Sequence, residues 1–147
     1  MTTHTRSRRR DQRGNAALEV LMVLPVIMVL AGLILAHGRV SMAQEAVSSA
    51  AGAAARAAAL ERSPANAHAA ATGVAAATLS SRELRCSTTT VTVDTSGLNT
   101  PVGQPGSVSA TVTCVVPFGD LGLPTKGSRV ITRTAVAPVD TYRGRGR

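Results

Sequence analysis

The hydrophobic pattern divides the chain into an apolar stretch, an alanine-rich stretch, and a region in which apolar and polar positions alternate. Residues 16–36 read AALEVLMVLPVIMVLAGLILA and carry a single charge, on Glu19. An apolar helix of about 20 residues crosses a hydrocarbon core of about 30 Å. The sequence therefore predicts a transmembrane helix over residues 16–36.

The residues that follow, 37–82, are rich in alanine and are predicted to be helical. Because almost every residue here tolerates a helix, the membrane helix is expected to continue as one helix over 16–62. Ser63 and Pro64 then have the pattern of an N-cap and a proline at the first helical position. They predict a second helix over 64–81, which is expected to form a hairpin with the first.

The alanine-rich part of the first helix has a weak apolar stripe. Its members are Val40, Val47, Ala51, Ala54 and Ala58. A face of small side chains lets another helix approach closely, and it buries little area at each contact. Two interpretations stay open: a packing surface for repeated lateral contacts with neighbouring chains, or a plain alanine-rich stalk.

Between residues 83 and 140 the apolar period changes from helical to two. In residues 107–116, valine, alanine and cysteine alternate with serine and threonine, as is typical of a half-buried strand. Partner strands are expected over 87–95 and 129–137. The predicted fold is α+β: a long N-terminal transmembrane helix that continues into an alanine-rich helical stalk, a second helix, and a small antiparallel three-stranded sheet covered on one face by a helix.

Positive charge gathers at the two ends of this chain of 147 residues, whose net charge is +8. The cluster before the apolar stretch consists of Arg6, Arg8, Arg9, Arg10 and Arg13. Basic residues just before a span keep that side in the cytoplasm, so residues 1–15 are expected to be a cytoplasmic head or leader, and the part after the span to lie outside. Residues 141–147 are expected to be a flexible basic tail. The basic residues are not accompanied by aromatic side chains on which bases could stack, or by a helix suited to the major groove of DNA. Nucleic acid is therefore not an expected partner.

The composition argues against an enzyme. The chain has one Phe, one Tyr and no Trp, so it offers little bulky apolar surface with which to line a pocket. Its Asp and His residues are scattered, and no catalytic, phosphate-binding or metal-ligating spacing is present. We therefore expect no catalytic residues, no cofactor, no metal and no small-molecule substrate.

The only two cysteines, Cys86 and Cys114, are expected to form a disulfide. Cys86 falls just before the first predicted strand, and Cys114 falls on the apolar face of the second. Outside the cytoplasm such a pair is more often bonded than reduced. A cross-strand bridge would help a domain with so small a core.

One short motif lies at the cytoplasmic edge of the predicted span. Gly14 follows the basic head, and Glu19 follows five positions later, at the start of the apolar helix. This arrangement resembles the processing site of type IV prepilins. The resemblance implies that prepilin peptidase cuts between Gly14 and Asn15, and that Glu19 pairs with the new amino terminus of a neighbouring subunit during assembly.

The longer string RGNAALEVLMVLP resembles the amino-terminal signature of TadE-like proteins, small pseudopilins of the tight-adherence pilus machinery. The resemblance implies a membrane-anchored structural component of pilus assembly or secretion, whose partners are the membrane and other pilin-like or pilus-assembly membrane proteins. The expected location is the cell membrane, with a single pass, a cytoplasmic N-terminus and an extracytoplasmic C-terminal region.

A second interpretation keeps the predicted β-rich region but gives the apolar stretch a different role, as a cleaved secretory signal. The basic head, the apolar stretch and the small-x-small sequence Ser41-Met42-Ala43 also have the layout of a cleaved secretory signal. In that case the chain would be a secreted or membrane-tethered binding module whose β-rich part recognises an external ligand.

Overall fold

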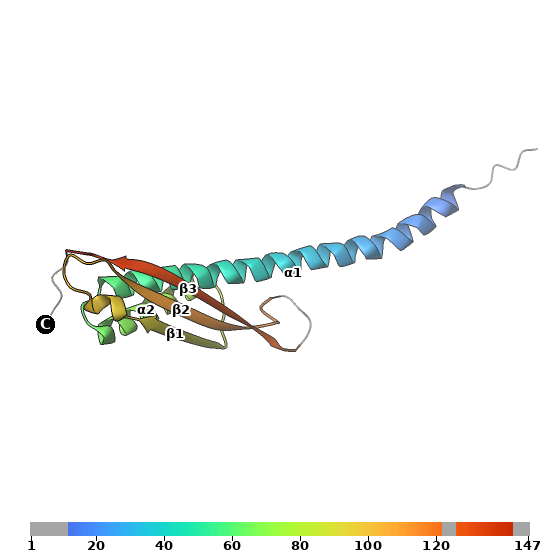
Figure 1. Cartoon of the computed structure of the whole chain (residues 1–147). Helices are drawn as coiled ribbons and strands as arrows, with labels where there is room; N and C mark the ends of the chain where they lie inside the picture. The colour runs from blue at the N-terminus through green and yellow to red at the C-terminus, as the bar shows by residue number, and fades with distance from the viewer. Residues whose placement is uncertain (1–11, 122–125, 143–147) are drawn as a thin grey trace, which may run out of the picture. The chain divides into compact units, whose positions relative to one another are not determined.

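The computed structural model describes residues 12–121 and 126–142 (Figure 1). The elements are α1 (Gln12–Leu60), α2 (Pro64–Ser81), β1 (Thr88–Asp94), the short 3₁₀ helix η1 (Ser96–Asn99), β2 (Gly106–Pro117) and β3 (Ser128–Val139). Their order confirms the predicted α+β class. The chain divides into two compact units, one that ends at His37 and one that begins at Gly38.

Helix α1 confirms the expectation of one helix from the apolar stretch into the alanine-rich region, and it contains Pro25. It begins at Gln12, earlier than the predicted start at residue 16, because Gln12 and Arg13 favour a helix and extend it over the polar residues. Arg6, Arg8, Arg9 and Arg10 and the tail residues 143–147 lie outside the described residues.

Helix α2 begins and ends where the sequence predicts. Ser63 has an extended backbone, and its side chain accepts a hydrogen bond of 3.2 Å from the backbone N–H of Asn66, with Pro64 at the first helical position. Arg82, just after α2, donates from Nη2 to Ser49 Oγ of α1 at 3.4 Å. The end of α2 therefore returns to Ser49, within the last quarter of α1, which gives the expected antiparallel hairpin.

The sheet is antiparallel, with the strand order β1-β2-β3. Val108, Ala110, Val112, Cys114 and Val116 of β2 are fully buried on one face. The opposite face carries threonines paired across β2 and β3, with hydroxyl distances of 2.8 Å for Thr111–Thr134 and 3.0 Å for Thr113–Thr132. The predicted alternation in β2 is confirmed. Between these threonine pairs and the ends of the strands, the open face also carries the exposed valines Val130 and Val136.

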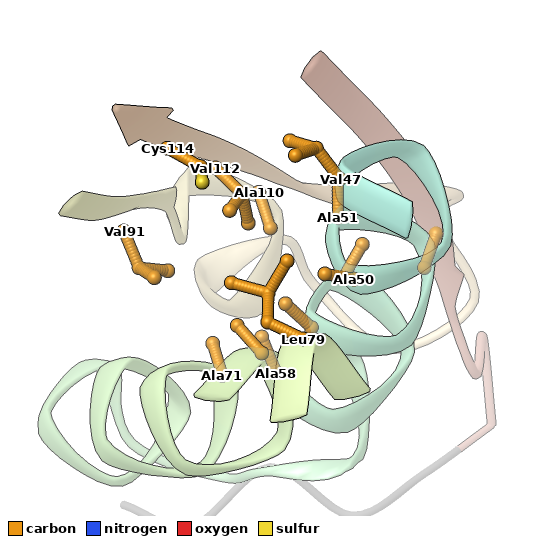
Figure 2. Close-up of a cluster of buried hydrophobic side chains, with 14 of the residues drawn as sticks. Val47, Ala50, Ala51, Ala58, Ala71, Leu79, Val91, Ala110, Val112 and Cys114 are labelled. Atoms are coloured by element: carbon orange, nitrogen blue, oxygen red, sulfur yellow. The ribbon is translucent and has the colours of Figure 1, made fainter. Parts of the chain in front are cut away.

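The core lies between the covered face of the sheet and the two helices. Figure 2 shows Val47, Ala50 and Ala51 of α1 and Leu79 of α2 pointing toward Val112 of β2. Val47, Ala51, Ala54 and Ala58 are each 0 % exposed. The interpretation of the alanine stripe as a packing surface for neighbouring chains was wrong, because the stripe packs against this chain's own helix and sheet. Small side chains there let α1 lie close to both, since each contact needs little room.

The two cysteines are joined in a disulfide that ties the connection after α2 to the centre of the sheet. Their Cα atoms are 5.4 Å apart, and Cys114 is fully buried on the covered face of β2. Next to the bridge, Ser87 donates to the carbonyl of Val115 from its backbone N–H at 2.8 Å and from its hydroxyl at 3.0 Å. The start of β1 is thus held to β2 by both covalent and hydrogen bonds.

Gly97 of η1 lies where no side chain fits. A Cβ atom added there would overlap the backbone of Ser107 in β2. We predict that Gly97→Ala lowers the free energy of unfolding by about 1–3 kcal/mol, the usual cost of overpacking. A lower melting temperature of the full chain in detergent, followed by circular dichroism, would check this.

Gly73, on the exposed side of α2, provides the matched control, because a Cβ atom there meets nothing within 4 Å. Gly73→Ala is expected to raise stability by about 0.5–1 kcal/mol through helix propensity. An unchanged or higher melting temperature of Gly97→Ala would contradict the tight packing of Gly97.

Candidate functional site

The first unit exposes an unusual amount of apolar surface. Every side chain from Leu18 to Leu35 is exposed, including Met22 at 78 % and Ile34 at 72 %. Among the described residues, α1 is the one helix long and apolar enough to cross a membrane. Exposure of so much apolar surface to water is unfavourable. A helix that is apolar on all sides is therefore typical of a membrane span or of a site that binds another protein.

Glu19 carries the only charge in the apolar stretch 16–36. It lines a shallow hollow of about 340 Å³ with Val20, Val23, Leu24 and Ile27, which follow one another along one side of α1. Among the side chains of residues 18–121 and 126–142, none forms a hydrogen bond or ion pair with its carboxylate. In a bilayer such a group costs about 2.5–3.5 kcal/mol near the helix centre and less toward the edge. A partner from another molecule would reduce this cost.

Gly14 and Asn15 lie within α1, together with Arg13. Their side chains are outside what the structure describes. Asn15 and Glu19 are four positions apart on one helix, so their backbone positions share a face. The helix therefore places the backbone of Asn15 and that of Glu19 on the same side, one turn apart.

Cleavage after Ala43, which the secretory-signal reading requires, would cut through a helix. Ser41, Met42 and Ala43 lie inside α1, and Ala43 is 3 % exposed as part of the core. Signal peptidase sites follow a short apolar segment of about 7–15 residues. The apolar stretch 16–36 is longer than that and contains Glu19, which argues against this reading.

The described residues hold no group of three His, Cys, Asp or Glu side chains that could bind a metal. They do hold a charged cleft that sequence reasoning missed. Its rim consists of Arg39, Arg82, Glu83 and Asp120. These residues come from three separate segments of the chain, so their spacing in the sequence did not indicate a common site. The one local signal was Glu83, because glycine is the usual residue just after a helix end.

Comparison with known protein families finds a match over about a third of the chain. Residues 14–63 match the family model described as putative Flp pilus-assembly TadE/G-like. The match begins at Gly14 and ends at Ser63, so it covers nearly all of α1 and confirms the resemblance over these residues. It supports involvement in Flp pilus assembly and suggests a structural component associated with the membrane. No curated protein and no solved structure matches the chain.

Proposed function

We propose that this chain, whose residues 14–63 match the TadE/G-like family model, is a membrane-anchored pseudopilin-like subunit of a Flp, or tight-adherence, pilus-assembly system. The observation that carries the proposal is that the matched segment contains the exposed apolar stretch together with Gly14 and Glu19. A single pass leaves the N-terminus in the cytoplasm and the unit that begins at Gly38 outside. The basic cluster before the span and the disulfide support this direction.

Processing would supply the missing partner of Glu19. Cleavage by prepilin peptidase between Gly14 and Asn15 gives Asn15 a free ammonium group four positions before Glu19. Opposite charges at this spacing neutralise each other within one helix or between two neighbouring helices. The lateral contacts of assembly then lie in the first helix, because the alanine stripe of residues 47–58 is buried inside its own domain.

The proposed topology can be tested with Ala69→Cys, which places a thiol on the exposed side of α2. We expect the chain to stay in the membrane pellet after alkaline carbonate extraction. A membrane-impermeant maleimide should label Ala69→Cys on intact spheroplasts, because α2 lies outside. The natural chain is the control, since both of its cysteines are in the disulfide. Release by carbonate, or labelling only after lysis, would contradict the topology.

A further inference from the structure

A cleft of about 380 Å³ opens in the second unit, beside the point where the chain enters it. Arg39 of α1, Arg82 and Glu83 after α2, and Asp120 after β2 form its exposed rim. Its floor is apolar and includes buried Leu121. The cleft thus presents two cations and two anions above an apolar base.

Glu83 adopts a conformation that costs stability. Its φ is 56°, and it is the only residue other than glycine with a positive φ in the described part of the chain. The turn is a Schellman motif, in which Leu84 N–H donates to Leu79 at 3.1 Å and Glu83 N–H donates to Ser80 at 3.0 Å. Glycine is the usual residue at this position. A carboxylate there also faces the negative end of the helix dipole.

Among residues 18–121 and 126–142, no cation or hydrogen-bond donor pairs with the carboxylate of Glu83. The side chains of Arg39 and Asp120 likewise form no hydrogen bond or ion pair with any described residue. Strain retained at one residue beside a cleft is typical of a functional site. A ligand with a cationic group would supply a partner for the carboxylate of Glu83.

The cleft lies close to the proposed membrane surface. Arg39 is three residues after Ala36, the last residue of the apolar stretch, and three residues span at most about 11 Å in any conformation. The headgroup layer on each side of a bilayer is about 5–8 Å thick. If the anchor is as proposed above, on which this step rests, the rim is within reach of outer-leaflet headgroups.

We propose that this cleft binds the headgroup of an aminophospholipid such as phosphatidylethanolamine. Arg39 and Arg82 supply charge-assisted hydrogen bonds to the phosphate, and Glu83 and Asp120 accept hydrogen bonds from the ammonium group. A quaternary ammonium headgroup is recognised by aromatic side chains, and the cleft has none. An anionic headgroup without an ammonium group would leave both carboxylates without a cation and close to the phosphate.

The test is native mass spectrometry of the full chain in detergent, with phosphatidylethanolamine and phosphatidylglycerol added in equal amounts. We expect about tenfold preferential retention of phosphatidylethanolamine, as one charge-assisted hydrogen bond provides. Glu83→Gln keeps the shape of the side chain and should abolish this preference while phosphatidylglycerol is still retained. Arg82→Gln should weaken both lipids. Arg56→Gln, an exposed arginine of α1 outside the cleft, should change neither.

Glu83→Gly separates a lipid site from a merely structural role. It should raise the melting temperature, because glycine relieves the positive φ, and it should also abolish the lipid preference. Equal retention of the two lipids by the natural chain, or an unchanged preference in Glu83→Gln, would overturn the proposal. Carbonate extraction tests the membrane anchor independently of the lipid site. A chain that stays in the membrane but shows no lipid preference would overturn the proposed lipid site and leave the proposed anchor intact.

Discussion

Glu19→Ala is expected to leave the chain in the membrane and to abolish its assembly with neighbouring pilin-like subunits. Loss of the carboxylate makes the span more apolar, so insertion is preserved. The free ammonium group of a processed neighbour would then be buried without a partner, which costs about 2–5 kcal/mol. This corresponds to at least a roughly 30-fold loss of association. Crosslinking in membranes, with the yield of linked species measured, would check it.

Two further variants sharpen this experiment. Glu19→Gln keeps the size of the side chain and removes its charge, so it should fail in the same way as Glu19→Ala. Glu45→Gln removes an exposed carboxylate from the part of α1 that belongs to the second unit, and it should crosslink like the natural chain. Unchanged crosslinking of Glu19→Ala would reject the assembly role.

Removal of the disulfide should have the largest effect on stability. The two cysteines are 28 positions apart, and the chain-entropy model assigns a loop of this length about 3–4 kcal/mol. Folded domains are stabilised by only about 5–15 kcal/mol, and this core consists mainly of alanine and valine. Cys86→Ala with Cys114→Ala should therefore lower the melting temperature of the second unit strongly. Thermal unfolding of the full chain in detergent measures this.

The reductant provides the matched control for the disulfide prediction. Dithiothreitol should lower the melting temperature of the natural chain and leave that of the double alanine variant unchanged. Alanine is chosen because Cys114 is fully buried and a serine hydroxyl there would add a cost of its own. If dithiothreitol left the melting temperature of the natural chain unchanged, the disulfide would contribute little to its stability.

Local signals account for what could be predicted of the fold. Ser63 and Pro64 defined the start of α2, and the alternation around Val112 defined β2 and its buried face. The spacing of Cys86 and Cys114 relative to the strands indicated their bond. The cap and the alternation act within a few residues, and the chain has only two cysteines to pair, so no knowledge of the tertiary structure was needed.

The rest depended on contacts that a single sequence does not reveal. The alanines at 51, 54 and 58 have the same pattern on a core helix as on a helix that packs against other chains. Only the position of α2 and the sheet shows which surface covers them. The cleft around Glu83 was missed because its rim combines three distant segments, and the left-handed backbone of Glu83 is set by the Schellman turn rather than by its side chain.

The intact mass of the chain extracted from membranes of a cell that carries prepilin peptidase tests the central claim most directly. We expect a mature species of residues 15–147 that remains in the membrane, with the two cysteines still oxidised. A chain cut after Ala43 and released to the medium would contradict it. So would an uncut chain in those membranes, since Glu19 would then lack the ammonium group with which it is proposed to pair.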